Sequence, residues 1–200
     1  MKIILSSSNK DKIQEIKSII GSDYELVLKS DIGYGDLDVE ENGQTLKENA
    51  HLKAKALYDL THENVIADDT GLFVDALNGA PGVYAARYSG KNATYDSNNE
   101  KLLEALKDYK NKEDRKAYFM TTICLITKEG KEYYAEGKLD GYIAFEKRGD
   151  NKFGYNPIFE VEDYNKTLAE FTDEERVSIN HRKRALDNLK ELLESVNIWK

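Results

Sequence analysis

Two adjacent aspartates interrupt an apolar stretch of the chain. Asp68 and Asp69 follow Val65-Ile66-Ala67 and precede Thr70-Gly71-Leu72-Phe73-Val74. Carboxylates near a core are costly to desolvate unless cations or hydrogen bonds compensate them. Neighbouring buried charges therefore usually serve a metal ion or acid–base chemistry. An exposed acidic turn between two strands is the alternative, and for this motif alone it is favoured.

Length and composition predict one globular domain, residues 1–200, with a substantial core. Because 40% of the residues are hydrophobic and no apolar run could span a bilayer, we expect a cytoplasmic protein with no membrane partner. The single cysteine, Cys124, lies in an apolar segment and is expected in the core. The net charge of −8 argues against a nucleic-acid partner, but not against a nucleotide in a local basic pocket.

Apolar periodicity and turn signals predict a mixed, twisted sheet with helices, in an α/β or α+β domain. Strands are expected at 2–5, 24–28, 64–68, 72–75, 117–127, 133–139 and 142–145, with a hairpin turn at 129–130. Helices are expected at 10–20, ended by Gly21, and behind capping boxes at Thr45, Ser97 and Thr172, reaching about residues 60, 109 and 196. Residues 30–42 are expected to be a loop and 79–82 a turn.

Two lysine-containing segments are candidates for binding phosphates. Ser7-Ser8-Asn9-Lys10-Asp11-Lys12 opens the first helix, where free backbone N–H groups attract anions and Lys12 can reach the same phosphate. Simple N-capping by Ser8 or Asn9, with a solvated Lys12, is the alternative, and it is favoured for this segment alone. Lys53 lies on the second helix, where it either contacts phosphate or extends to solvent.

The acidic residues are suited to Mg²⁺. Oxygen ligands such as those of 68–69 hold this ion together with water and substrate phosphates. Glu40 and Glu41 precede the second helix and either bind a cation or are loop charges. The histidines, His51, His62 and His181, have no spacing typical of zinc.

A late segment is a candidate for binding a base. Phe153-Gly154-Tyr155-Asn156-Pro157 places an aromatic ring beside a glycine, which suits stacking, or it is a turn with core aromatics. Arg176 and Asn180-His181-Arg182 can donate to a purine carbonyl. For 181–182 the alternative is the first turn of a solvated helix capped by Asn180.

Together these motifs resemble the inosine/xanthosine triphosphate pyrophosphatase family over nearly the whole chain. The markers are Ser7-x-Asn9-x-x-Lys12, Glu48-Asn49-Ala50-x-x-Lys53-Ala54, Asp68-Asp69-Thr70-Gly71-Leu72, Gly79-Ala80-Pro81-Gly82-Val83-Tyr84-x-Ala86-Arg87-Tyr88, Phe153-Gly154-Tyr155-Asn156-Pro157 and His181-Arg182. The resemblance implies an α/β fold with an elongated mixed sheet flanked by helices, two lobes with a nucleotide cleft between them, and a homodimer. It implies Mg²⁺-dependent hydrolysis of non-standard purine triphosphates (ITP, dITP, XTP) to the monophosphate and pyrophosphate.

The resemblance also implies roles for individual residues. Asp69 is the expected proton acceptor and, with Glu41, a metal ligand, while Asp68 supports the site. The expected substrate-binding residues are Ser7, Asn9, Lys12, Lys53, Thr70, Phe153, Gly154, Tyr155, Asn156, Arg176, His181 and Arg182. Phe153 would stack on the base, and His181 with Arg182 would contact its 6-oxo edge, which adenine lacks.

Several residues depart from the family's commonest pattern. Ser7 replaces threonine, Thr70 replaces serine and Asn180 replaces serine, each keeping its polar function. Arg176 replaces lysine, and Asn156 replaces aspartate, which removes a charge next to the base. Two alternatives therefore stay open: a purine sensor without hydrolysis, and a pyrophosphatase for pyrimidine or modified triphosphates.

Overall fold

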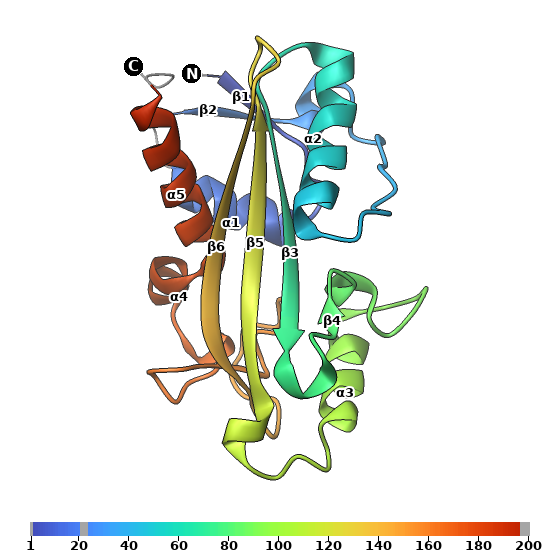
Figure 1. Cartoon of the computed structure of the whole chain (residues 1–200), viewed down its shortest axis with the longest axis vertical. Helices are drawn as coiled ribbons and strands as arrows, with labels where there is room; N and C mark the ends of the chain where they lie inside the picture. Colours follow the sequence, from blue (N-terminus) through green and yellow to red (C-terminus); the bar gives the residue numbers. More distant parts are fainter. Residues whose placement is uncertain (1, 21–23, 197–200) are drawn as a thin grey trace. The chain divides into compact units, whose positions relative to one another are not determined.

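The computed structural model describes residues 2–20 and 24–196 (Figure 1). Its strands are β1 (Lys2–Leu5), β2 (Glu25–Leu28), β3 (Val65–Val74), β4 (Pro81–Gly82), β5 (Lys116–Ile126), β6 (Glu132–Ile143) and β7 (Phe159–Val161). Its α-helices are α1 (Lys10–Ile20), α2 (Leu46–Thr61), α3 (Tyr95–Ala105), α4 (Asp173–Ile179) and α5 (His181–Ser195). None of the described helices is long and apolar enough to cross a membrane.

The strands form a mixed sheet in the order β2-β1-β3-β5-β6-β7, with β4 paired to β3. β1 is parallel to both β2 and β3, whereas the β3–β4 and β6–β7 pairs are antiparallel. This confirms the predicted α/β fold around a mixed sheet. The chain divides into two compact units, the first formed by residues 1–69, 121–137 and 181–200, the second by 70–120 and 138–180.

In the first unit, helices cover both faces of the sheet (Figure 1). Successive side chains of a strand point to opposite faces. Ile66 of β3 accordingly packs with Ile16 of α1 and Leu189 of α5, while Val65 and Ala67 pack with α2. Cys124 belongs to the α2 side and is fully buried, as predicted.

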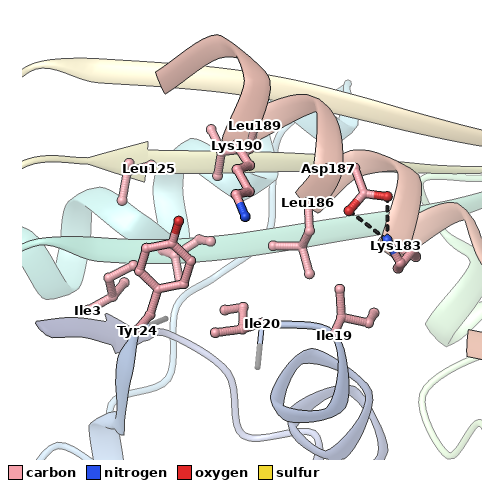
Figure 2. A pocket seen from close by; sticks show the side chains of 11 residues that line it. Ile3, Ile19, Ile20, Tyr24, Leu125, Lys183, Leu186, Asp187, Leu189 and Lys190 are labelled. Atoms are coloured by element: carbon pink, nitrogen blue, oxygen red, sulfur yellow. Dashed lines mark hydrogen bonds and ion pairs between the residues drawn. The ribbon is translucent and has the colours of Figure 1, made fainter. Parts of the chain in front are cut away.

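An apolar cavity of about 240 Å³ lies in the first unit (Figure 2). Side chains of α1 and α5, including Ile19, Ile20 and Leu186, line it together with Tyr24. The ion pair between Lys183 and Asp187 lies at its edge. None of the residues predicted to bind substrate or metal lines this cavity.

The second unit has its own core, in which Phe119 of β5 and Phe159 of β7 pack with ring centroids 4.6 Å apart. Leu102 and Leu106, at the end of α3, are fully buried against this core. These buried side chains hold α3 against the core of the second unit. The orientation of the helix in turn determines which way the side chains of its first turns point.

Several predicted elements are wrong in their bounds. The strands expected at 64–68 and 72–75 form one continuous strand, β3. Gly71 is therefore a strand residue and not part of a turn. It lies so close to β4 that a Cβ at this position would come 2.8 Å from the Gly82 oxygen. The strand expected at 142–145 is the end of β6. The 30–42 loop begins within a 3₁₀ helix, Lys29–Ile32.

Helix bounds also differ from the prediction. The N-cap of α3 is Thr94 and not Ser97. Ser97 is the third residue of the helix, and its side chain completes the capping box with Thr94. The terminal helix expected from Thr172 is two helices, because Asn180 has an extended backbone (φ −63°, ψ 141°) between α4 and α5. The capping boxes at Thr45 and Thr172 and the hairpin turn at 129–130 are confirmed. Gly21, the predicted stop of α1, lies outside the described residues.

Candidate active site

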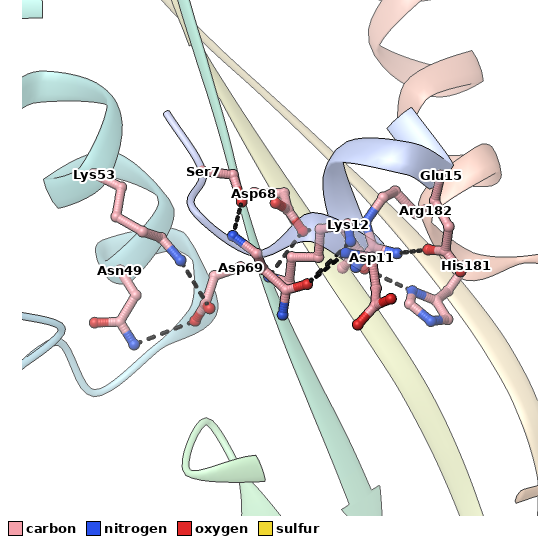
Figure 3. Close-up of polar contacts among 12 residues, drawn as sticks. Ser7, Asp11, Lys12, Glu15, Asn49, Lys53, Asp68, Asp69, His181 and Arg182 are labelled. Carbon is pink, nitrogen blue, oxygen red and sulfur yellow. Dashed lines mark hydrogen bonds and ion pairs between the residues drawn. The ribbon is translucent and has the colours of Figure 1, made fainter. Parts of the chain in front are cut away.

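The site in the first unit is built on the alternation of β3. Asp68 and Asp69 are both buried, at 3% and 6% exposure, which excludes the exposed acidic turn. Asp68 follows the side of β3 that faces α1 and α5, and Asp69 follows the side that faces α2. Figure 3 shows their carboxylates with side chains from these helices around them.

Asp68 is bound by two cations. Lys12 Nζ lies 3.1 Å from Asp68 Oδ2, and Arg182 Nε donates to the same oxygen at 3.2 Å. The Arg182 guanidinium also pairs with Glu15 of α1. Burial alone would raise the pKa of the Asp68 carboxyl, but the charges of Lys12 and Arg182 hold it well below its usual range. Asp68 therefore stays ionised and ties α1, β3 and α5 together.

Asp69 has a different environment. Its Oδ1 lies 3.1 Å from Lys53 Nζ, and its Oδ2 accepts from Asn49 Nδ2 at 3.2 Å. Both partners are on α2. Burial raises the pKa of the Asp69 carboxyl, and the Lys53 ammonium opposes this shift without cancelling it. A carboxylate with a raised pKa is a better proton acceptor than an ordinary aspartate.

Lys53 also pairs with Glu41, whose Oε2 lies 3.1 Å from the same Nζ. One ammonium nitrogen thus lies within 3.1 Å of an oxygen from each of two carboxylates. Among the described residues, no group of three or more histidine, cysteine or acidic side chains could hold a metal. Two carboxylates around one cation position suit Mg²⁺, which keeps several waters and takes its other ligands from substrate phosphates. The residues present therefore fit this ion.

The start of α1 supplies Lys12 and two smaller polar residues. The Asn9 side chain accepts from the backbone N–H groups of Asp11 and Lys12 at 3.0 and 3.1 Å, and it therefore caps the helix. The capping part of the alternative is confirmed for Asn9, but the solvated Lys12 that it expected is wrong, because Lys12 is paired with the buried Asp68. Ser7 is half-buried, and its hydroxyl accepts from Asn9 N at 3.3 Å. Phosphate contacts from these residues stay a prediction.

Lys12 is poorly solvated for a lysine. Burial lowers the pKa of its ammonium, the Asp68 charge offsets part of this shift, and the neighbouring charges of Lys53 and Arg182 lower the pKa further. Two lysines from different helices therefore act on each other electrostatically at this site. The carboxylates paired with these lysines balance their charge, so the site offers a polyphosphate individual ammonium donors and not a net positive charge.

His181 and Arg182 open α5, and both are buried. His181 Nδ1 lies 2.6 Å from the Thr121 hydroxyl of β5. Burial, reinforced by the charge of Arg182, holds the pKa of the His181 imidazole well below its usual range. Arg182 donates to Asp68 through Nε and to Glu15 through Nη1. Its predicted role at the base stays a prediction.

The aromatic segment belongs to the second unit. Phe153 is half-buried, and its ring meets that of Tyr95 in a T-shaped contact, with centroids 5.5 Å apart. Asn151 Oδ1 accepts from Phe153 N at 3.1 Å and from Asn156 Nδ2 at 2.8 Å. The asparagine at 156 therefore has a structural partner that an aspartate could not donate to.

The other predicted residues of this unit have internal partners as well. Tyr155 donates its hydroxyl hydrogen to the Ala85 oxygen at 2.8 Å. Arg176 is buried and pairs with Asp173 on its own helix at 2.5 Å. Thr70 follows Asp69 on β3 and is half-buried. Substrate contacts by these residues stay predictions.

Sequence reasoning missed several partners of the site. Asn49 belongs to one of the family motifs, but its hydrogen bond to Asp69 is not predicted from the sequence. The signal for it is its position one helical turn before Lys53, which places both side chains on the same face of α2. Glu15 and Thr121 have no such signal, because their partners are 167 and 60 residues away along the chain.

The fold and site define an α/β protein in which buried carboxylates and lysines from three segments meet at one place. The model of the Ham1 family matches residues 3–192. The chain belongs to the Ham1 family.

Relatives agree with this assignment over nearly the full length. The chain is 49% identical over 191 residues to the dITP/XTP pyrophosphatase of Thermoanaerobacter sp. (strain X514), covering 95% of each chain. It is 46% identical over 202 residues to the dITP/XTP pyrophosphatase of Clostridium perfringens (strain 13 / Type A), covering 98% of each. The solved structure of the Staphylococcus aureus Ham1 protein matches with a TM-score of 0.86 at 40% identity, over 98% of this chain and 99% of that chain. The resemblance stated from the motifs is confirmed.

Proposed function

We propose that this protein hydrolyses non-standard purine nucleoside triphosphates, dITP and XTP among them, to the monophosphate and pyrophosphate. Its family membership and its relatives make it a nucleoside-triphosphate pyrophosphatase, a hydrolase. The observation that carries the proposal is the shared cation position, where Lys53 Nζ lies 3.1 Å from both Asp69 and Glu41. A triphosphate with Mg²⁺ requires this combination of oxygen ligands and positive charge.

In the proposed reaction, Asp69 accepts a proton from the attacking water. The new bond forms between the water oxygen and the α-phosphorus, and the bond from the α-phosphorus to the bridging oxygen breaks, so that pyrophosphate leaves. Bound Mg²⁺, held by Asp69 and Glu41, would neutralise charge on the phosphates. The position of Asp69, buried beside Lys53 and Glu41, supports its role as the acceptor.

Lys12 and Lys53 are proposed to bind the phosphates, with Ser7 and Asn9 beside them. A phosphate oxygen would replace part of each lysine's present pairing with Asp68 or Asp69. Lysine ammonium groups can follow such a change because they are point charges on flexible stems. Phe153 is proposed to stack on the base, and a homodimer is part of the proposal.

A substrate panel tests the proposal. Rates of pyrophosphate release are measured for dITP, XTP, dGTP, dATP and dTTP with Mg²⁺. We expect dITP and XTP to be hydrolysed at least about tenfold faster than dATP, because the adenine amino group in place of the 6-oxo group leaves donors at the base unpaired. We also expect dGTP and dTTP to be hydrolysed more slowly than dITP and XTP. Equal rates for all five, or orthophosphate as the first product, would contradict the proposal. The protein's mass in solution, measured by light scattering, checks the dimer.

A further inference from the structure

The side chains of α3 that face the aromatic segment have no role in the family motifs named above. Tyr95 and Asn99 lie four residues apart on this helix, so they share one face. Tyr95 contacts the Phe153 ring, and Asn99 Nδ2 donates to the Gly154 oxygen at 3.1 Å. Both contacts lie within the second unit. They end on Phe153, which is proposed to stack on the base, and on its neighbour Gly154, an expected substrate-binding residue.

We propose that Tyr95 and Asn99 are positioning residues, which hold the Phe153 ring and the Gly154 backbone in the arrangement that receives a purine base. This inference rests on the proposed function, because it deepens the role of Phe153. Neither side chain is assigned to the reaction itself.

The contact with Tyr95 fixes the orientation of the Phe153 ring. The interplanar angle of 71° at 5.5 Å is the edge-to-face geometry that aromatic pairs prefer. In such a pair Tyr95 contacts at most one face of the Phe153 ring. The opposite face has no contact with Tyr95. Tyr95 is 39% exposed, so it is not a core residue.

Asn99 holds the backbone next to that ring. It is 2% exposed, and its Oδ1 has no hydrogen-bond partner in the described part of the chain. A buried amide with an unsatisfied oxygen is unfavourable for stability alone. The Asn99 Nδ2 group donates to the oxygen of Gly154, which has a left-handed φ of +55°. A Cβ at residue 154 would meet nothing within 4 Å, so the backbone lies beside open space there.

Other hydrogen bonds hold the rest of the segment in place. Asn151 holds Phe153 N and Asn156, and Tyr155 donates to the Ala85 oxygen. Asn98, the neighbour of Asn99, binds the same loop through the Ala85 and Ala86 oxygens at 3.3 and 3.1 Å. α3 therefore anchors the loop at 85–86 through Asn98 and the aromatic segment through Asn99.

The test compares a substrate with a base to one without. KM and kcat are measured for dITP and for ribose 5-triphosphate in the Tyr95→Leu, Asn99→Asp and Phe153→Ala variants. Asn99→Asp keeps the shape of the side chain but removes the donor to Gly154. The control is Tyr164→Leu, which removes a matched contact in the same unit: Tyr164 is 51% exposed and meets Phe171 in a T-shaped pair at 5.3 Å and 78°.

We expect Tyr95→Leu and Asn99→Asp to raise KM for dITP by about two- to tenfold, the range of one aromatic contact or hydrogen bond. Constants for ribose 5-triphosphate should not change, and Tyr164→Leu should match the unmodified protein on both substrates. In a Phe153→Ala background, Tyr95→Leu should have no further effect on dITP.

Two results would overturn the inference while the proposed function stands: a Tyr95→Leu variant with unchanged KM for dITP, or equal losses on both substrates in either variant. Equal losses would mean that α3 serves stability only. Unchanged KM for dITP in Phe153→Ala would instead refute the proposed stacking role of Phe153, and the inference with it.

Discussion

Asp68 and Asp69 are adjacent in the chain, yet each carboxylate is bound by a lysine from a different helix. Lys12 of α1 lies 3.1 Å from Asp68, and Lys53 of α2 lies 3.1 Å from Asp69. Their surroundings shift the two pKa values in opposite directions, downward for Asp68 and upward for Asp69. When the pKa values of two neighbouring acids are shifted apart in this way, the acid with the lowered pKa stays ionised and the acid with the raised pKa can exchange a proton.

Replacing Asp68 should unfold the site. Asp68→Asn leaves Lys12 and Arg182 without their shared carboxylate, and loss of one member of a buried ion pair costs about 3–5 kcal/mol. Urea unfolding measures this loss. Asp187→Asn is the control, because its pair with Lys183 is partly exposed and should contribute under about 0.5 kcal/mol. A loss for Asp68→Asn as small as that of the control would contradict the account.

Gly137 of β6 should not tolerate a side chain. A Cβ there would come 2.1 Å from the His181 oxygen and 2.3 Å from Ala185 N, so Gly137→Ala must displace the first turn of α5. We expect a destabilisation of about 1–3 kcal/mol, as for overpacked cores, together with reduced turnover of dITP. The matched change Gly35→Ala should cost little, because its Cβ would meet Ser30 only at an ordinary 3.6 Å. Equal unfolding midpoints for the two variants would show that α5 adapts.

Stability should fall as pH drops below the ordinary histidine range. The folded pKa of His181 is depressed below the unfolded value of about 6.5, so the unfolded state binds more protons in between. His181 therefore contributes stability above pH 6.5, and this contribution is lost as pH falls toward the folded pKa, with a slope of up to about 1.4 kcal/mol per pH unit. NMR titration of the imidazole checks this directly. Protonation of His181 with a midpoint near 6.5 in the folded protein would refute it.

Glu41 should affect the metal requirement more than the fold. Glu41→Gln removes one of two carboxylates at the proposed cation position, so the Mg²⁺ concentration for half-maximal pyrophosphate release should rise at least about tenfold. Glu40→Gln is the control, since Glu40 is the exposed neighbour on the same loop. Identical Mg²⁺ dependence in the two variants would remove Glu41 from the metal site.

The chemistry of the site was more predictable than its geometry. Carboxylates inside an apolar stretch require compensation when they are buried, so residues 68–69 predicted a site once the lysine-containing motifs were considered with them. The mixed sheet and the capping box at Thr45 also followed from local patterns. The pairing of Arg182 with Asp68 and Glu15 did not, because it joins residues 114 and 167 apart and depends on how α5 packs on the sheet.

The errors in element bounds have a related cause. Thr70-Gly71 has the composition of a turn, but the partner strand β4 requires a glycine there within a continuous strand. Tertiary contact overrode local propensity at that place. The continuity of β3 matters for function, because its strict alternation sends Asp68 and Asp69 to opposite helices.

The central claim is that Asp69, beside Lys53 and Glu41, accepts the proton of the attacking water. The most direct measurement is pyrophosphate release from dITP at saturating Mg²⁺ by Asp69→Asn, with its folded state checked by urea unfolding. Asparagine keeps the shape and cannot accept the proton, so we expect turnover to fall by at least about 10²-fold, the lower end of what a general base supplies. Turnover equal to that of the unmodified protein would contradict the account.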